Sequence, residues 1–286
     1  MKIQLASNYG FCFGVKRAIK IAEEHQGSKT YGPLIHNKDE INRLKEGFQI
    51  GLAENLDEIT PEDSVVIRTH GIPKDELAKL NIQNNQIIDA TCPYVTTPQN
   101  IVAEMSKKGY SIVVFGDKNH PEIKGVVSYA KDPRNAFVVI DENELEGLPI
   151  LSKVAVVAQT TRKPKDYLKV VNKLILEHKE VRVFNTICNA TFENQDAAAV
   201  LAKDADVMIV IGGKHSSNTK QLHSICKTYC GDSYLIENQD ELRLVWFKNK
   251  ELCGISAGAS TPDWIVQNVI EKIQELVQKA EVLKSE

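Results

Sequence analysis

Three cysteines, Cys12, Cys92 and Cys188, occur in the same local setting, each after a short apolar run and before a helical pattern. They lie 80 and 96 residues apart, so the spacing between neighbours is about a third of the chain. A helix N-terminus stabilises a thiolate, because free N–H groups and the helix dipole favour negative charge there. The repetition predicts three similar pieces whose thiolates converge on one metal centre.

Strand-length apolar runs alternate with helical patterns along the chain, which is typical of an α/β fold with mostly parallel, buried strands. The expected strands lie at 3–6, 65–68, 87–90, 111–115, 136–140, 154–158, 181–184, 207–211 and 252–256. Helices are expected at 15–25, 38–45, 98–108, 164–178, 195–202 and 219–228. Thr97 and Pro98 form an N-cap and first-turn proline, which predicts that the helix after Cys92 begins at Pro98. A last helix over 262–284 should pack one apolar face on the body.

Each cysteine is followed by two polar loops at the ends of expected strands. They are YGPLIHN and RTHGIP after Cys12, FGDKNHPE and AQTT after Cys92, and IGGKHSSNT and SAGAST after Cys188. Ligands gather beyond the carboxyl ends of the strands in open α/β sheets. We therefore expect a trefoil of three α/β units related by a pseudo-threefold axis around a central metal site. The expected units are 14–92, 93–184, and 1–13 together with 185–286.

The overall composition argues against several classes of protein. A net charge of −3 gives no reason to expect a nucleic-acid partner. No run approaches the roughly 18 apolar residues that cross a bilayer. Met1 also leads directly into the first expected strand, so we expect a cytoplasmic protein with no signal peptide and no membrane partner.

Six cysteines in such a chain are better explained as thiols or metal ligands than as a disulfide framework. Cys226 and Cys230 are four residues apart on one face of an expected helix, a spacing that could ligate a metal but is more often structural. Cys253 lies in an expected strand and is interpreted as a core residue. These three are left out of the predicted site.

Three cysteine ligands without a nearby fourth leave two metal centres open. One is a tetrahedral zinc ion with a histidine as its fourth ligand, and the other is a [4Fe–4S] cluster with one iron open to substrate. Structural zinc usually binds closely spaced cysteine pairs, so the wide spacing here favours the cluster. A zinc-bound hydrolase or diphosphate-binding protein and a purely structural scaffold remain alternatives.

The strand-end loops are rich in groups that bind phosphate oxygens. Ser216, Ser217 and Asn218 follow a Gly-Gly turn, where they could bind an anion or simply cap a helix. Histidines at matched loop positions can be cationic donors near neutral pH; they are His36, His70 and His120. The sequence contains no G-x-G-x-x-G or Walker motif, so any electrons would come from a separate carrier.

One carboxylate stands out in these loops. Glu122 follows His120 in HPEIKG, where it could donate a proton to a leaving hydroxyl. A capping or dipole interaction in the first turn of its own helix explains a glutamate at this position equally well.

A series of motifs runs in order between Tyr9 and Trp264: GFCFGVKRAI, YGPLIHN, THGIP, DATCP, GDKNHPEIKG, AQTT, TICNAT, KHSSNT and AGASTPDW. This series resembles the motifs of the 4-hydroxy-3-methylbut-2-enyl diphosphate reductase family. The resemblance implies a trefoil around a [4Fe–4S] cluster and the last step of the non-mevalonate isoprenoid pathway. In that step two electrons and two protons remove the allylic hydroxyl of the substrate, which yields isopentenyl and dimethylallyl diphosphate.

The resemblance also implies roles for individual residues. The cluster ligands would be Cys12, Cys92 and Cys188, and the open iron would bind the substrate hydroxyl. Glu122 and Thr160, with His120 nearby, would position and protonate that hydroxyl. The substrate would be bound by His36, His70, His120, Thr160, Ser216, Ser217, Asn218 and Ser260. An external donor such as ferredoxin or flavodoxin would supply electrons to a monomer or homodimer.

Two positions depart from the family pattern. His215 stands beside the serine pair where an asparagine is often found, so no catalytic role is assigned to it. Pro98 and the two threonines before it replace a lysine that is common after the second cysteine. Thr161 and Thr191 match family positions that line the pocket.

Overall fold

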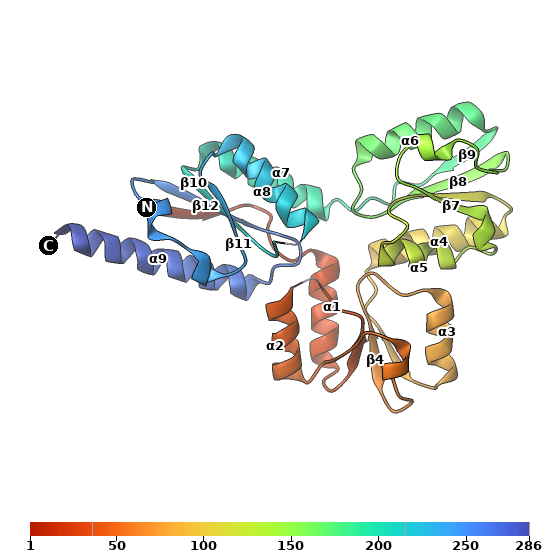
Figure 1. Ribbon diagram of the computed structural model, residues 1–286, viewed down its shortest axis with the longest axis horizontal. Coiled ribbons are helices and arrows are strands. Elements are labelled where there is room, and N and C mark those ends of the chain that lie inside the picture. The colour runs from red at the N-terminus through yellow and green to blue at the C-terminus, as the bar shows by residue number, and fades with distance from the viewer. Residues whose placement is uncertain (36, 215, 286) are drawn as a thin grey trace. The chain divides into compact units, whose positions relative to one another are not determined.

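The computed structural model describes residues 1–35, 37–214 and 216–285 of the 286-residue chain. Within them, twelve strands form three four-stranded sheets in which all paired strands are parallel, with helices between them (Figure 1). This arrangement confirms the predicted α/β class. Three short strands lie outside the predicted set: β2 (Lys29–Tyr31), β3 (Gly51–Ala53) and β11 (Ser233–Ile236). The first two have only three residues each, too few for a recognisable apolar run.

The chain forms two compact units, which are described separately. The first comprises Met1–Lys16, Ile35–Arg43 and Asn189–Glu286, and the second comprises Arg17–Leu34 and Leu44–Cys188. Helices α1 (Phe13–Glu24) and α2 (Lys38–Phe48) contribute residues to both units. The division into three units at the bounds given above stays a prediction.

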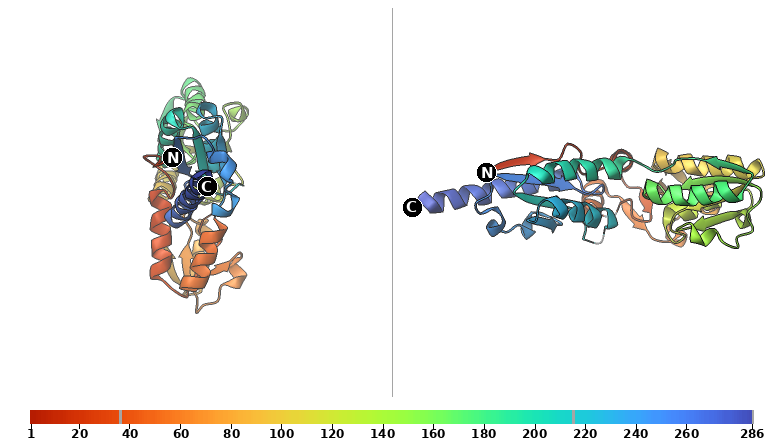
Figure 2. Two further views of the ribbon diagram at one scale, coloured as in Figure 1. Left: turned by 90° about the vertical axis from the view of Figure 1, so that its left-hand side faces the viewer. Right: turned by 90° about the horizontal axis from the view of Figure 1, so that it is seen from above.

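The first unit contains one sheet with the strand order β1 (Lys2–Leu5), β12 (Leu252–Ala257), β10 (Val207–Ile211) and β11. Met208 and Val210 of β10 pack against α7 (Ala190–Asp204) and α8 (Ser217–Tyr229). The alternate residues Ile209 and Ile211 pack with α9 (Asp263–Ser285), so helices cover both faces (Figure 1). The C-terminal helix therefore packs one face on the body, and its last turns extend beyond the sheet (Figure 2).

The second unit contains the other two sheets. One has the order β3, β2, β4 (Ser64–Ile67) and β5 (Gln86–Asp89), with α3 (Lys74–Ile82) on one face. The other has the order β7 (Ala136–Val139), β6 (Ser111–Phe115), β8 (Lys153–Ala158) and β9 (Glu180–Val183). Helices α4 (Pro93–Lys107) and α5 (Pro121–Ser128) cover one face of this sheet, and α6 (Pro164–Glu177) covers the other (Figure 1). Among the helices of the described ranges, none combines the length and apolar character needed to cross a membrane.

The predicted start of the helix after Cys92 is wrong. Helix α4 begins at Pro93, with Cys92 as its N-cap, and Pro98 lies inside it. Pro93 already supplies a first-turn proline, and starting there buries Val95 in the core. Inside the helix Pro98 has no N–H to donate to the Tyr94 carbonyl four residues earlier, and the helix continues past it. Tertiary packing thus overrides the local Thr-Pro signal.

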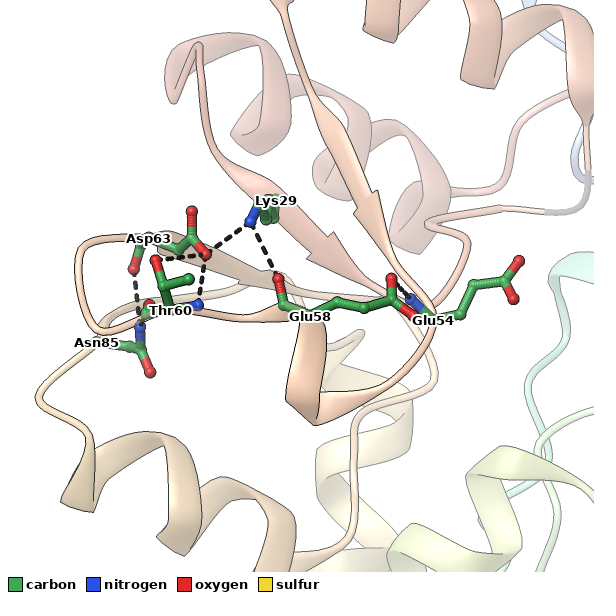
Figure 3. Close-up of polar contacts among 6 residues, drawn as sticks. All are labelled: Lys29, Glu54, Glu58, Thr60, Asp63 and Asn85. Atoms are coloured by element: carbon green, nitrogen blue, oxygen red, sulfur yellow. Dashed lines mark hydrogen bonds and ion pairs between the residues drawn. The ribbon is translucent and has the colours of Figure 1, made fainter.

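A polar cluster lies at the N-terminal ends of the strands of the β3–β2–β4–β5 sheet (Figure 3). Cys92 follows β5, so it lies at the opposite ends of these strands. Lys29 at the start of β2 donates to Asp63 Oδ2 at 2.8 Å and to the Glu58 carbonyl at 3.0 Å. The same carboxylate oxygen accepts the Thr60 N–H at 2.7 Å. The Asn85 amide donates to the Thr60 carbonyl at 2.6 Å, which links the start of β5 to the cluster. The hydrogen bond from Lys29 is the main cause that lowers the pKa of Asp63.

We expect Asp63→Asn to lower the free energy of unfolding by about 1 kcal/mol at pH 7. Because the pKa of Asp63 is lower in the folded chain, its contribution is complete above the unfolded value of about 3.9 and is lost as pH falls through the folded value. Urea unfolding of both proteins at pH 7 and at about pH 3 measures this. Asp57→Asn, which removes an exposed carboxylate nearby, is the control. An equal loss at both pH values would contradict the prediction.

Candidate functional site

Each of the three predicted ligand cysteines follows an edge strand of a different sheet. Cys12 follows β1, Cys92 follows β5 and Cys188 follows β9. In each case the cysteine N–H donates to a backbone carbonyl just beyond the neighbouring central strand. The acceptors are the carbonyls of Ala259, Thr69 and Thr160, at N···O distances of 3.4, 3.0 and 2.7 Å. The repeated local setting in the sequence therefore corresponds to one hydrogen bond repeated in three sheets.

The six polar loops follow the two central strands of each sheet. The central strands are β12 and β10, β2 and β4, and β6 and β8. Each cysteine-bearing edge strand pairs with the central strand that leads to a second loop. Cys12 therefore lies beside SAGAST, Cys92 beside RTHGIP and Cys188 beside AQTT.

The donor chemistry of these three cysteines suits a metal centre. All three are partly exposed thiols, and helices α1, α4 and α7 begin within two residues of them. Cys226 and Cys253 are buried thiols, whose pKa desolvation raises to about 12. Cys230 is buried as well, which is consistent with leaving all three out of the site. Partly exposed thiolates at helix N-termini are fit ligands for an iron–sulfur cluster.

Two histidines of the second unit lie against each other. The rings of His70 and His120 meet edge to face, with centroids 5.3 Å apart. His70 follows β4, and His120 is the N-cap of α5, where its Nδ1 accepts the Glu122 N–H at 3.2 Å. An Nδ1 that accepts must be unprotonated, so neutral His120 carries its hydrogen on Nε2.

Glu122 is buried and bound to the AQTT loop. Its two carboxylate oxygens accept from the N–H and the hydroxyl of Thr160, both at 2.8 Å. Burial raises the pKa of Glu122, and the hydrogen bonds from Thr160 partly oppose that effect. The carboxylate thus bonds a residue 38 positions away and does not cap its own helix. This contact favours the site interpretation of Glu122 over the capping alternative.

A continuous series of contacts joins the predicted site residues of the second unit. Cys92 bonds to Thr69, the residue before His70, and His70 packs on His120. His120 bonds to the amide of Glu122, Glu122 bonds to Thr160, and the Thr160 carbonyl accepts the Cys188 N–H. Gln159 adds a support that the sequence did not suggest, because its side chain accepts the Asp117 N–H at 3.0 Å and so ties AQTT to the His120 loop.

Neither unit, over its described residues, gathers three or more His, Cys, Asp or Glu side chains in a geometry that could hold a metal ion.

The first unit brings together Cys12 and the two loops after β10 and β12. Ser260 follows the residue that accepts the Cys12 N–H. Ser216 is the N-cap of α8, and its hydroxyl accepts the Thr219 N–H at 3.3 Å. Gly212 lets these loops approach, since a Cβ there would lie 2.8 Å from Thr261 Oγ1.

Four residues singled out from the sequence need separate mention. The Oδ1 atom of Asn218 is buried, with no hydrogen-bond partner in the described part of the chain. The predictions for His36, for His215 and for the Ser217 side chain lie outside the described residues.

Two further residues hold the segments that lead into the cysteines. The Arg17 guanidinium donates to the carbonyls of Thr91 and Asp89, at 3.1 and 3.4 Å, just before Cys92. Asn194, buried in α7, donates to the Gly10 carbonyl at 3.2 Å, just before Cys12. Sequence reasoning did not single out either residue. Arg17 lies inside the GFCFGVKRAI motif, which is the one signal that could have drawn attention to it.

Comparisons with known proteins agree with this architecture. Residues 3–274 match the model of the LytB protein family. The chain is 85% identical over 276 residues to 4-hydroxy-3-methylbut-2-enyl diphosphate reductase of a Sulfurovum species, a match that covers 96% of this chain and 100% of that protein. It is 64% identical to the protein of the same name from a Nitratiruptor species, over 96% of this chain and 99% of that protein.

Solved structures show the same fold. One is (E)-4-hydroxy-3-methyl-but-2-enyl diphosphate reductase, described as the terminal enzyme of the non-mevalonate pathway. It matches with a TM-score of 0.81 and 42% identity, over 96% of this chain and 100% of that one. The E-1-hydroxy-2-methyl-but-2-enyl-4-diphosphate reductase of Plasmodium falciparum matches with a TM-score of 0.80 and 27% identity, over 94% of this chain and 86% of that one. From its sequence and its fold, this chain belongs to the LytB protein family.

Proposed function

We propose that this chain removes the allylic hydroxyl of (E)-4-hydroxy-3-methylbut-2-enyl diphosphate by reduction and forms isopentenyl and dimethylallyl diphosphate. The names of its relatives support the reaction. The observation that carries the proposal is the buried carboxyl of Glu122, bonded twice to Thr160 within one contact series that ends at Cys92 and Cys188. A proton donor beside two candidate metal ligands suits a reaction that breaks a C–O bond with electrons and protons.

The proposed cofactor is a [4Fe–4S] cluster with Cys12, Cys92 and Cys188 as its ligands. When bound, it would pass the two electrons from the donor to the substrate one at a time, and it would offer an iron atom that has no protein ligand. We propose that an external donor such as ferredoxin or flavodoxin reduces it. The proposed setting is the cytoplasm, with the protein as a monomer or homodimer.

Glu122 is the proposed acid of the reaction. Because burial raises its pKa, the carboxyl holds a proton closer to neutral pH than an exposed glutamate does. It gives this proton to the hydroxyl oxygen as the C–O bond breaks, so water leaves. A second proton adds to either end of the remaining allyl group, which accounts for two products. The Thr160 hydroxyl then stabilises the carboxylate that is left.

The diphosphate is the proposed ligand of the histidines and the helix α8 N-terminus. His70 and His120 can donate from ring N–H groups to phosphate oxygens. Ser216, Asn218 and Ser260 of the first unit add hydroxyl and amide groups, and the first N–H groups of α8 favour an anion. His36 and Ser217 complete the proposed set.

Anaerobic purification followed by iron and sulfide analysis, together with a turnover assay driven by an external reductant, tests this function. We expect about four irons and four sulfides per chain and formation of both products. A zinc-containing, colourless protein without reductive turnover would overturn the proposal.

Thr160→Val should change the pH dependence of turnover. The substitution removes the hydroxyl that donates to Glu122 but keeps the backbone N–H bond. Because that hydroxyl lowers the pKa of Glu122, its loss should raise the pKa. Glu122 acts in its protonated form, so the alkaline limb of the kcat profile should move to higher pH. A pH series measures this, Thr160→Ser is the control, and an unmoved limb in Thr160→Val would contradict the assignment.

A further inference from the structure

The three sheets share a second hydrogen bond, two residues before each cysteine. In the first sheet Gly10 N–H donates to the Ala257 carbonyl at 3.0 Å. In the sheet that leads to Cys92, Ala90 N–H donates to the Ile67 carbonyl at 3.1 Å. Each acceptor lies two residues before the carbonyl that binds the cysteine N–H. The two bonds together set the direction in which the chain enters the cysteine.

The third sheet makes this bond with a side chain. Thr186 lies two residues before Cys188, and its hydroxyl donates to the Ala158 carbonyl at 2.6 Å. The same hydroxyl accepts the Ala158 N–H at 2.8 Å. Ala158 is the last residue of β8 and stands two residues before Thr160, so it is the equivalent of Ala257 and Ile67. One buried hydroxyl therefore satisfies both backbone groups of Ala158.

We propose that Thr186 is a positioning residue, whose hydroxyl holds Cys188 and Thr160 in the same relation that backbone bonds maintain at the other two cysteines. Strand β9 ends at Val183. The last backbone hydrogen bond from this segment to β8 runs from the Phe184 N–H to the Val156 carbonyl. The Thr186 hydroxyl then connects this segment to Ala158 of β8. It thereby brings the Cys188 N–H to the Thr160 carbonyl. Thr160 in turn holds the carboxyl of Glu122. The catalytic part of this inference rests on the proposed function.

The third sheet is the one in which this bond can be removed by a side-chain substitution. Thr186→Val keeps the shape of the side chain but leaves the buried N–H and C=O of Ala158 without their partner. Thr186→Ser keeps the hydroxyl. Tyr167→Phe is a matched control. The Tyr167 hydroxyl lies 2.9 Å from the carbonyls of Val156 in β8 and of Phe184 in the departing segment, before Thr186, and shares its one hydrogen between them.

Amide hydrogen exchange of the full chain, purified anaerobically, tests the geometry. In Thr186→Val we expect the amides of Cys188 and Thr160 to exchange at least about tenfold faster than in the unsubstituted protein. Thr186→Ser should stay within about twofold, and Tyr167→Phe should lower stability without accelerating these two amides. If the valine variant does not fold, Thr186→Ala provides the same loss of the hydroxyl. Unchanged exchange in the variants without the hydroxyl, or equal acceleration in Tyr167→Phe, would overturn the proposal.

Turnover of the same samples tests the catalytic consequence. We expect Thr186→Val to lower kcat about tenfold with KM within about twofold, since a displaced acid costs rate more than binding. Thr186→Ser should keep kcat near that of the unsubstituted protein. A normal kcat in Thr186→Val despite faster amide exchange would overturn the catalytic consequence of the proposal. An inactive unsubstituted protein would instead overturn the proposed function, while the exchange experiment would still decide the role of Thr186.

Discussion

Glu122→Gln is expected to lower kcat by about 10²- to 10⁴-fold while the iron content and substrate affinity stay near those of the unsubstituted protein. The glutamine has nearly the same shape. Its amide oxygen can accept from the Thr160 N–H and its NH₂ group can donate to the Thr160 hydroxyl, so the loop contact survives. It cannot release a proton to the departing oxygen. The substitution therefore lowers turnover and not substrate affinity.

Single-turnover assays with chemically reduced protein, alongside equilibrium binding of the substrate, measure the two quantities separately. Glu146→Gln, at an exposed position of the same unit, makes the same chemical change and should leave turnover unaffected. The pH profile adds a second readout, because the alkaline limb that belongs to Glu122 should disappear in the variant. Unchanged turnover in a Glu122→Gln sample with full iron content would falsify the proposed role.

Cys92→Ser is expected to remove most of the iron and sulfide and the visible absorption of the cluster. A serine hydroxyl is a far poorer ligand than a thiolate, and a cluster with three protein ligands keeps only two. We expect equal losses for Cys188→Ser and for Cys12→Ser. Cys12→Ser is the most informative of the three, because Cys12 belongs to the first unit, Cys92 and Cys188 belong to the second, and the proposal requires all three as ligands.

Cys226→Ala is the matched control for these substitutions. Its thiol is buried where α8 packs on β10, and burial raises the pKa of that thiol to about 12. We expect a loss of stability of about 1 kcal/mol from the small cavity, with normal iron content. Iron and sulfide analysis of freshly reconstituted, anaerobic samples distinguishes the three ligand substitutions from this control. A Cys12→Ser variant with full iron content would mean that the cluster needs no ligand from the first unit.

The cysteine pattern shows how far local reasoning reaches. Apolar runs that lead to a cysteine, followed by a helical pattern, indicated strand ends and helix N-termini, and the structure confirms both. The edge position of these strands is known only from the structure. The pattern also separated the buried Cys226 and Cys253 from the partly exposed cysteines. These features follow from hydrophobic periodicity and helix capping within about a dozen residues, so they can be read from the chain alone.

Local reasoning failed where packing competes with a local signal. The Thr97-Pro98 pair is a sound helix start, yet α4 begins at Pro93 because the earlier turn buries Val95. Strands β2 and β3 are three residues long and exist because a neighbouring strand supplies their hydrogen bonds. Pairing energy of this kind depends on residues distant in the sequence, which no local window contains.

By itself, the sequence determined the α/β class, the three cysteine settings and the polar loops, because strand and helix periodicity and the position of each loop are local properties. Two residues show what only the tertiary structure decided. From the sequence, Glu122 fits a helix cap and a proton donor equally well, and its bond to Thr160, 38 residues away, favours the proposed donor role. Thr186 lies in the TICNAT motif, but the motif does not indicate its bonding partner, because the bond joins it to the end of β8, which lies 28 residues earlier. A hydrogen bond between distant segments has no local pattern, and the folded chain alone brings its two partners together.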